Sequence, residues 1–317
     1  MKIISVFDTS ISEYNLGNQI IMDSVEYELN DIFNNRFQYN IPYQQVTKSL
    51  KKCFDQSDYV FFGGTNSLSS FMNKYRQWDI NLRKTAYVKD VIMLGIGWWQ
   101  YQDDPNYYTK LILNRALNKE YYHSARDSYT EEKLKKLGFK VINTGCPTTW
   151  RLTKDKLKAI DKSMKKEEVV ITFTDYNKDF NSDKMLFDIC KENYKKIYIW
   201  PQGVGDFDYI KKLDTDGVAI IIDSNLKAYD EILINKDVDY IGTRLHAGMR
   251  ALQKGVRAFF VAVDNRTIEI GKDIGIPYVE RKNIKELKEK IYSPYNSNFN
   301  INYEGIEMWK NQFKLKS

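Results

Sequence analysis

The sequence predicts an α/β protein with two doubly wound domains, each built on a parallel sheet. Short apolar runs alternate with longer amphipathic segments along most of the 317 residues. This order is typical of parallel sheets that are covered by helices on both faces. A polar, lysine-rich stretch at 155–168 interrupts the alternation and indicates a domain boundary. We therefore expect one domain at 1–152 and a second at 153–317.

The strands of the first domain are expected where short apolar or β-branched runs occur. These runs lie at 2–7, 59–63, 91–97, 120–125 and 140–145. The second domain repeats the pattern, with runs at 169–174, 196–201, 218–223, 238–242 and 256–263. A last amphipathic segment, about 303–316, is expected to form a helix that packs on either domain. In such folds ligands bind at the carboxyl ends of the strands, so candidate residues are sought there.

Composition limits the possible partners. Hydrophobic residues make up 43% of the chain, and the formal net charge of +6 comes from interspersed acids and bases. Such a diffuse charge does not indicate nucleic acid, but it suits an anionic substrate or an anionic membrane surface.

The cysteines and the start of the chain bear on location. Cys53, Cys146 and Cys190 match no metal or disulfide spacing, which indicates reduced thiols and no metal site. The apolar start is too short for a signal peptide, and no run approaches the roughly 18 apolar residues of a membrane helix. We expect a cytoplasmic protein, and peripheral association with a membrane stays open.

The segment 238–263 holds one of the two histidines of the chain. Thr243 is expected to be the N-cap of a helix that follows a buried strand, which puts His246 at the third helical position. Free backbone N–H groups, the helix dipole and Arg244 make this place favourable for an anion. The alternative is a partly buried histidine that bonds a backbone group, and spacing alone leaves both readings open.

Two further arginines follow predicted strands. Arg126 precedes a capping box, Ser128 to Glu131, which predicts the start of a helix. Arg266 opens a helix, where the dipole disfavours a cation, and this is a mild hint of an anionic ligand. The alternatives are a surface arginine at 126 that pairs with Asp127 or another acid, and a solvated charge at Arg266.

Glycine-containing loops leave room for a ligand at two strand ends. Gly17 and Asn18 follow the first strand, although a glycine turn with an asparagine cap explains them as well. Gly64 and Asn66 follow the next predicted strand, where the backbone could approach a ligand closely. The sequence has no dinucleotide-binding G-x-G-x-x-G in these loops, no P-loop and no G-x-S-x-G. An NAD-dependent oxidoreductase is therefore least favoured.

In their order along the chain these motifs resemble those of the polysaccharide pyruvyl transferase family. The most specific is T-R-L-H at 243–246, which a small-residue helix and a Gly-Val strand follow. Weaker matches are N-L-G-N at 15–18, F-G-G at 62–64, G-I-G at 95–97, A-R-D at 125–127 and G-C-P at 145–147. The resemblance covers about residues 3–280.

The resemblance implies two Rossmann-like domains in a GT-B-like arrangement, with the acceptor on the first domain and the donor on the second. It implies transfer of the enolpyruvyl unit of phosphoenolpyruvate onto two hydroxyls of a sugar, giving a pyruvate ketal and phosphate. The sugar would belong to a cell-surface polysaccharide, such as an exopolysaccharide, or to its precursor. Phosphoenolpyruvate is the donor substrate, so no cofactor is expected. Whether the acceptor is linked to a lipid at the inner membrane face stays open.

The resemblance also implies roles for individual residues. His246 matches the family's acid, which would protonate carbon 3 of the donor, and Arg126 matches its catalytic arginine. Thr243 and Arg244 are expected to bind the donor. Arg266 stands where the family often has a lysine that binds an anion.

The remaining candidates are expected to bind substrate: Gly17, Asn18, Gly64, Asn66 and Trp98. The sequence departs from the family around them. Thr65 and Asn66 replace a third glycine, bulky W-W-Q-Y follows at 98–101, and Thr174-Asp175 stands where relatives often have an arginine. These departures affect the expected acceptor more than the expected donor, because aromatic surfaces often bind sugar faces.

Two other functions stay open. A GT-B glycosyltransferase that uses a sugar nucleotide would also have two α/β domains with cationic strand ends, but a nucleoside diphosphate would protect it. A non-catalytic relative that binds a glycan or a partner is the third reading. The retention of His246 with its nearby arginines argues against it.

Overall fold

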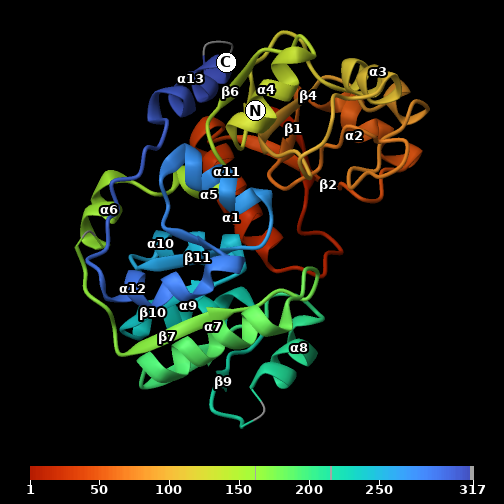
Figure 1. Ribbon diagram of the computed structural model, residues 1–317. Helices are drawn as coiled ribbons and strands as arrows, with labels where there is room; N and C mark the ends of the chain where they lie inside the picture. Colours follow the sequence, from red (N-terminus) through yellow and green to blue (C-terminus); the bar gives the residue numbers. More distant parts are fainter. Residues whose placement is uncertain (161, 215, 315–317) are drawn as a thin grey trace. The chain divides into compact units, whose positions relative to one another are not determined.

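The computed structural model describes residues 1–160, 162–214 and 216–314, and its chain forms two compact units (Figure 1). The first unit contains Met1–Glu13, Ile21–Trp150 and the segment from Ile301 on, and the second contains Tyr14–Ile20 and Arg151–Asn300. The chain thus stays in the second unit from Arg151 to Asn300 and returns to the first at Ile301. The terminal amphipathic segment packs in the first unit.

In the first unit the described residues form a six-stranded parallel sheet of order β2-β1-β3-β4-β5-β6. The strands are β1 (Lys2–Asp8), β2 (Arg36–Pro42), β3 (Tyr59–Gly63), β4 (Val91–Ile96), β5 (His123–Ala125) and β6 (Val141–Asn143). All five predicted strands are present. The sequence analysis missed β2 because this edge strand is rich in polar residues and mostly only half-buried.

The described part of the second unit also forms a six-stranded parallel sheet, of order β12-β11-β10-β7-β8-β9. Its strands are β7 (Glu168–Thr172), β8 (Lys196–Ile199), β9 (Ile220–Ile221), β10 (Val238–Gly242), β11 (Ala258–Ala262) and β12 (Tyr278–Glu280). The short β12 was not predicted. The strand order reverses direction between β7 and β10, and such a switch point is where doubly wound sheets bind ligands.

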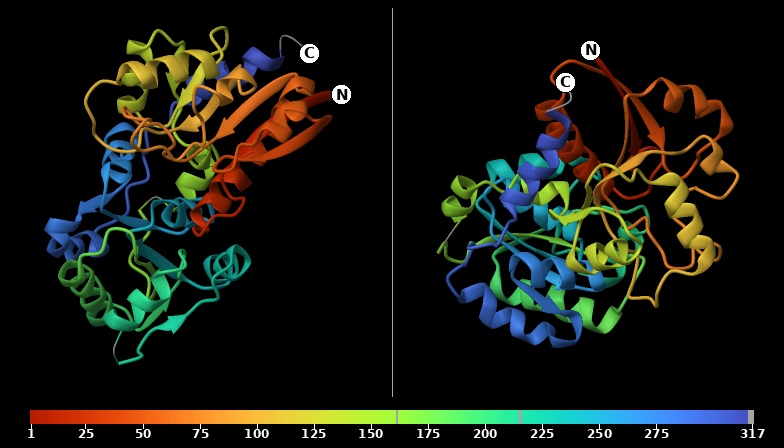
Figure 2. Two further views of the ribbon diagram at one scale, coloured as in Figure 1. Left: turned by 90° about the vertical axis from the view of Figure 1, so that its right-hand side faces the viewer. Right: turned by 90° about the horizontal axis from the view of Figure 1, so that it is seen from above.

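Helices connect the strands in both units (Figures 1 and 2). The first unit has α1 (Gly17–Ile32), whose first turn clusters with the second unit, and α2 (Lys51–Gln56), α3 (Tyr107–Ala116), α4 (Ser128–Lys136), α5 (Pro147–Trp150) and α13 (Tyr303–Lys314). The second has α6 (Lys154–Ile160), α7 (Phe180–Asn193), α8 (Asp206–Leu213), α9 (Leu226–Asn235), α10 (Leu245–Gln253), α11 (Asn265–Ile274) and α12 (Leu287–Tyr292). Right-handed crossovers put α7 and α8 on one face of the second sheet and α10 and α11 on the other.

The last helix, α13, completes the first unit. Phe313 packs against Phe33 and Phe61 with ring centroids 6.0 and 5.2 Å apart, and Trp309 packs on Trp150 at 5.6 Å. Each fully buried aromatic side chain of this kind contributes roughly 1.5–3 kcal/mol by leaving water. The first unit therefore depends on residues from both ends of its sequence.

A buried ion pair fixes the amino ends of β10 and β11 in the second unit. Arg257 donates from Nε and Nη2 to the two carboxylate oxygens of Asp239, at 2.8 and 3.0 Å. Both side chains are buried, and Arg257 also donates to the carbonyls of Ser163 and Ile291. The pair lies at the amino edge of the sheet, opposite the carboxyl ends of the strands.

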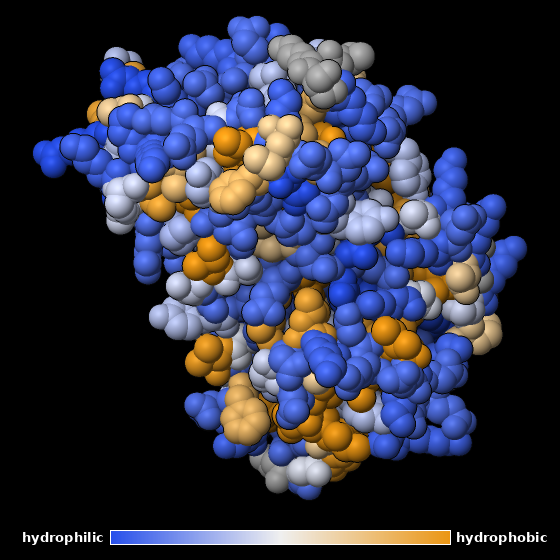
Figure 3. All heavy atoms as spheres, turned by 180° about the vertical axis from the view of Figure 1, so that it is seen from behind, coloured by the Kyte–Doolittle hydropathy of each residue, from blue (hydrophilic) through white to orange (hydrophobic). Residues whose placement is uncertain are grey.

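Hydrophilic side chains cover most of the face drawn in Figure 3, and apolar side chains gather there in separate patches. Among the described helices, none is both long and apolar enough to cross a membrane.

Candidate active site

The residues predicted in the T-R-L-H motif lie at the switch point of the second sheet. The prediction that Thr243 caps the helix is wrong: α10 begins at Leu245 and its N-cap is Arg244. The physical reason is that the Thr243 N–H still donates to the Thr172 carbonyl, at 3.0 Å, and so extends the pairing of β10 with β7. His246 is therefore the second helical residue, not the third, and its side chain is buried.

Arg244 is held by the ends of β7 and α8. Its Nε donates to the Phe173 carbonyl at 3.1 Å, and its Nη2 donates to Asp175, at 3.0 Å, and to Asp206. Burial raises the pKa of the Asp206 carboxyl above its ordinary value, although Arg244 and the Gly203 N–H favour the charged form. Arg244 thus supplies a positive charge that offsets the carboxylates of Asp175 and Asp206 at this end of the sheet.

Asp206 continues this network to the loop that contains Gly17 and Asn18. Its second carboxylate oxygen accepts from the backbone N–H groups of Gln202 and Gly203. Gln202 in turn donates from Nε2 to the Asn15 side chain at 2.7 Å, and its carbonyl accepts from Leu16. A Cβ at Gly17 would lie 2.6 Å from Gln202 Nε2, so a larger residue here would displace the Gln202 side chain. The predicted loop therefore belongs by its contacts to the second unit.

Arg266 lies at the end of β11, on the first turn of α11. It donates to the carboxylate of Asp264, the N-cap residue, and to the Tyr176 hydroxyl. The paired carboxylate offsets the unfavourable interaction between this cation and the helix dipole. Arg266 is not the freely solvated charge of the alternative reading.

In the first unit, Arg126 follows β5 and is 1% exposed. Its Nε and Nη2 donate to Asp127 at 3.2 and 3.0 Å. Asp127 is also the N-cap of α4, because its other oxygen accepts from the Thr130 N–H at 2.8 Å. The predicted capping box is therefore wrong by one residue: Asp127, and not Ser128, caps the helix. Glu131 instead accepts from the Asn143 N–H.

Arg126, Asn66 and Gly97 lie against one another at the carboxyl edge of the first sheet. A side chain at Gly97 would lie 2.3 Å from the Arg126 guanidinium and 2.5 Å from Asn66 Oδ1. Asn66 Oδ1 and Arg126 Nη1 are both buried without a hydrogen-bond partner among the described residues. A buried polar group left this way costs about 1–3 kcal/mol, which suggests that a ligand or water completes the pair.

The turn before Asn66 has a left-handed backbone. Gly64 has φ +64° and Thr65 has φ +68°. Glycine adopts this conformation without cost, whereas a β-branched residue such as threonine does not. Thr65 is thus strained at the position where the sequence analysis expected a third glycine from the family resemblance.

Trp98 lies in the core of the first unit. It is fully buried, and its indole N–H donates to Ser70 and Gln102 at 3.2 and 3.1 Å. The buried ring leaves no face for a sugar in this structure. The neighbouring Trp99 is half-buried and stacks on Tyr75 with ring centroids 4.0 Å apart.

The structure thus groups the predicted residues in two sets. Thr243, Arg244, His246 and Arg266 lie at neighbouring strand ends of the second unit, which also holds Gly17 and Asn18. Gly64, Asn66 and Arg126 lie at the carboxyl edge of the first. Sequence reasoning missed three residues that orient them: Tyr176, Gln202 and Asp206. The only sequence signal for these was that they follow predicted strands.

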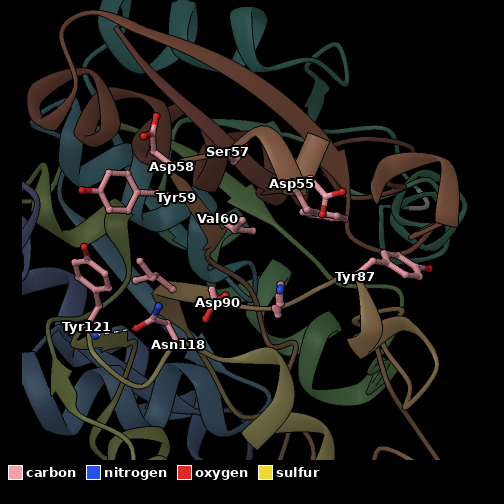
Figure 4. Close-up of a pocket in the computed structure, with 12 residues that line it drawn as sticks. Asp55, Ser57, Asp58, Tyr59, Val60, Tyr87, Asp90, Asn118 and Tyr121 are labelled. Carbon is pink, nitrogen blue, oxygen red and sulfur yellow. Dashed lines mark hydrogen bonds between the residues drawn. The ribbon is translucent and has the colours of Figure 1, made fainter. Parts of the chain in front are cut away.

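A cavity of about 410 Å³ lies at the opposite, amino edge of the first sheet. Figure 4 shows Tyr59 and Tyr121 at one end of its lining, Tyr87 at the other, and Asp90 between them. None of the predicted site residues lines it. Its lining residues are therefore suited to control substitutions.

Comparison with known proteins now identifies the family. A family model for polysaccharide pyruvyl transferases matches residues 15–265. The chain belongs to the polysaccharide pyruvyl transferase family. As a member of this family it keeps Arg126 and the 243–246 motif within the matched region, and Arg266 lies one residue beyond it. A search of curated proteins gives no match for this pyruvyl transferase family member.

Solved structures confirm the fold class. A UDP-GlcNAc 2-epimerase of Methanocaldococcus jannaschii, in complex with UDP-GlcNAc and UDP, is 13% identical, with 99% of each chain covered and a TM-score of 0.56. The Neisseria meningitidis UDP-GlcNAc 2-epimerase bound to UDP-GlcNAc is 14% identical, with both chains fully covered and a TM-score of 0.50. Staphylococcus aureus MnaA with UDP is 12% identical, covers 100% of this chain and 97% of that one, and has a TM-score of 0.52. At these identities the likeness shows the fold alone, a pair of Rossmann-like, doubly wound domains of the GT-B-like class.

Proposed function

We propose that this family member transfers the enolpyruvyl unit of phosphoenolpyruvate to two hydroxyls of a sugar in a cell-surface polysaccharide or its precursor. The product is a pyruvate ketal, and phosphate is released. The observation that carries the proposal is the placement of Arg244 and Arg266 at the ends of the neighbouring strands β10 and β11, beside His246. A donor with a carboxylate and a phosphate needs such fixed cations.

The proposed reaction balances in atoms and protons without a cofactor. His246 gives a proton to carbon 3 of the donor, and carbon 2 becomes oxocarbenium-like. One sugar hydroxyl bonds to carbon 2 and loses its proton, which returns a proton to the histidine. The bond from carbon 2 to the phosphate oxygen then breaks, and the second hydroxyl closes the ketal. Its proton leaves with the phosphate.

His246 must be protonated at the start, although a helix N-terminus favours the neutral ring. The negative charge of the bound donor favours the protonated form and supplies the compensation. We expect NMR titration of His246 to give a higher pKa with a donor analogue than without it. The same pKa in both states would remove the basis for its role as the acid.

Ligand protection of the folded protein tests the donor. We would measure thermal unfolding with phosphoenolpyruvate, UDP and GDP, for the wild type, His246→Asn and Asp90→Asn. A ligand at 100 times its dissociation constant adds about 2.7 kcal/mol, which corresponds to several degrees for domains of this size. We expect phosphoenolpyruvate alone to protect, with an altered response in His246→Asn. The variant Asp90→Asn, in the cavity at the opposite sheet edge, should respond like the wild type.

Protection by a nucleoside diphosphate alone would replace this proposal with a glycosyltransferase that uses a sugar nucleotide. If phosphoenolpyruvate protects, candidate acceptor sugars are screened by phosphate release, with ketal formation followed by NMR. We place the reaction on the cytoplasmic side, with a sugar acceptor that is free or lipid-linked at the inner membrane face. Recovery of the activity in membrane-free cytosol, or only with washed membranes, distinguishes these two acceptors.

A further inference from the structure

The loop at 173–179, which follows β7, connects the cationic side chains of the second unit. Among the described residues, arginines from the ends of β10, β11 and β12 all bond to it. Arg244 donates to Phe173 and Asp175, Arg266 donates to Tyr176, and Arg281 donates to the Asn177 carbonyl at 2.6 Å. The loop thus reaches across the switch point and contacts successive strand ends of the sheet.

Within this loop, Tyr176 contacts two of the arginines with one ring. The guanidinium carbon of Arg244 lies 5.1 Å from the ring centroid, and that of Arg266 lies 5.3 Å from it. Both distances are within the range of cation–π attraction. The Tyr176 hydroxyl accepts a hydrogen bond from Arg266 and donates one to Asp264, at 3.3 Å.

This geometry opposes the natural tendency of the two cations to separate. Like charges repel each other, and a long arginine side chain loses rotamer freedom when it is fixed. The electron-rich ring attracts both guanidinium groups, and Asp175 and Asp264 offset part of their charge. Tyr176 is itself 51% exposed, so its ring is not needed to fill a core.

From these contacts we infer that Tyr176 is a positioning residue that presents Arg244 and Arg266 as one paired site for a donor with two anionic groups. The inference rests on the proposed function for the identity of the donor. An arginine pair that is fixed before the donor arrives loses less entropy on binding, so the ring contributes to donor affinity without touching the reacting atoms. The expected specificity is for a donor whose carboxylate and phosphate bind together, rather than for either anion alone.

The test compares Tyr176→Leu, which removes the ring, with Tyr176→Phe, which keeps it. Tyr292→Leu is a matched control, because Tyr292 is also 51% exposed in the second unit, donates to Asn193 at 2.9 Å and has the Lys165 ammonium 5.6 Å from its ring. We would measure the dissociation constants of phosphoenolpyruvate and inorganic phosphate by calorimetry, and check folding by thermal unfolding without ligand.

We expect Tyr176→Leu to raise the dissociation constant of phosphoenolpyruvate about tenfold, equivalent to about 1.4 kcal/mol. Tyr176→Phe should recover most of this loss, because the ring remains. The binding of inorganic phosphate should weaken less in Tyr176→Leu, since a single anion does not use both arginines. An unchanged affinity in Tyr176→Leu, or an equal loss in Tyr292→Leu, would overturn the inference.

An NMR measurement tests the geometry without any ligand. The Nε–Hε signals of Arg244 and Arg266 should both shift in Tyr176→Leu through loss of the ring current, while that of Arg281 stays in place. If only one signal moves, the shared-ring arrangement is refuted. If the wild type binds phosphate but not phosphoenolpyruvate, the proposed donor fails, and the positioning role of Tyr176 is then judged by these NMR signals alone. If it binds neither, the paired anion site is refuted as well.

Discussion

Arg126 and Asp127 are adjacent in the chain, and their side chains form a buried ion pair at the end of β5. Both are 1% exposed, and the pair leaves Arg126 Nη1 without a partner among the described residues. One carboxylate oxygen of Asp127 binds the arginine and the other caps α4. A single side chain therefore orients the candidate catalytic arginine and starts a helix.

The two roles of Asp127 can be separated by substitution. Asp127→Asn keeps an oxygen for the cap but loses the charge, and we expect the free energy of unfolding to fall by about 3 kcal/mol, because a buried cation loses its partner. Asp127→Ala also loses the cap and should cost about 1 kcal/mol more. Urea denaturation measures both. The exposed pair of Glu132 and Lys136 supplies the control Glu132→Gln, which should change the free energy of unfolding far less, because solvent screens this pair. Equal stability of Asp127→Asn and wild type would contradict the account.

The strain at Thr65 predicts a stabilising substitution. A left-handed conformation costs a non-glycine residue roughly 1–2 kcal/mol, while glycine costs about 0.5–1 kcal/mol more entropy on folding. Thr65→Gly should therefore raise the free energy of unfolding by about 0.5–1 kcal/mol in denaturant titrations. Thr47, with φ −109°, is the matched control, and Thr47→Gly should destabilise. A loss of stability in Thr65→Gly would mean that its side-chain contacts outweigh the strain.

His123 predicts a pH dependence of stability. Its Nδ1 accepts from the Met93 N–H, its Nε2 bonds the Asn118 carbonyl, and burial lowers its pKa from 6.5 to about 4. Below pH 6.5 the His123 imidazole is protonated in the unfolded chain but stays neutral in the folded chain. The free energy of unfolding therefore falls as the pH drops from 6.5 to 4, by up to about 3 kcal/mol from this group. The stability advantage of wild type over His123→Asn should shrink as the pH falls across this window, whereas a pH-independent difference would refute the assignment.

The Asp239–Arg257 pair predicts strong coupling between two positions. Arg257→Met leaves a buried carboxylate without its partner and should cost about 3–5 kcal/mol. The double variant Arg257→Met with Asp239→Leu should recover a large part of this loss, because no buried charge remains unpaired. A double-mutant cycle from urea denaturation gives the coupling energy. Additive losses would show that the two side chains act independently.

The sequence predicted the buried strands well because apolar runs such as 59–63 and 238–242 need few other assumptions. It failed at β2, where polar residues form an edge strand, and at β12, which has three residues. The helix caps were wrong by one residue at Ser128 and at Thr243, because the bonds that decide them come from a neighbouring ion pair and a neighbouring strand.

The residues of the candidate site were likewise predictable only in part. A strand end followed by an arginine is visible in the sequence, so Arg126, Arg244 and Arg266 could be chosen. The orientation of Arg244 and Arg266 also depends on residues far away in the chain: Asp175 lies 69 positions before Arg244, and Tyr176 lies 90 positions before Arg266. Such pairings follow from the order of strands in a sheet, which hydrophobic patterns alone do not specify.

The packing of α13 on the first unit has a consequence for biosynthesis. Residues 151–300, the bulk of the second unit, are translated between the first unit's strands and the helix that covers Phe33, Phe61 and Trp150. At roughly 5–20 residues per second this interval lasts roughly 8–30 s. The nascent first unit keeps an uncovered aromatic surface through that time, and we expect it to need chaperone protection on the ribosome while the second unit folds. Protease resistance of stalled nascent chains would reveal the order of folding. Protection of the first unit before α13 emerges would show that it folds without this helix.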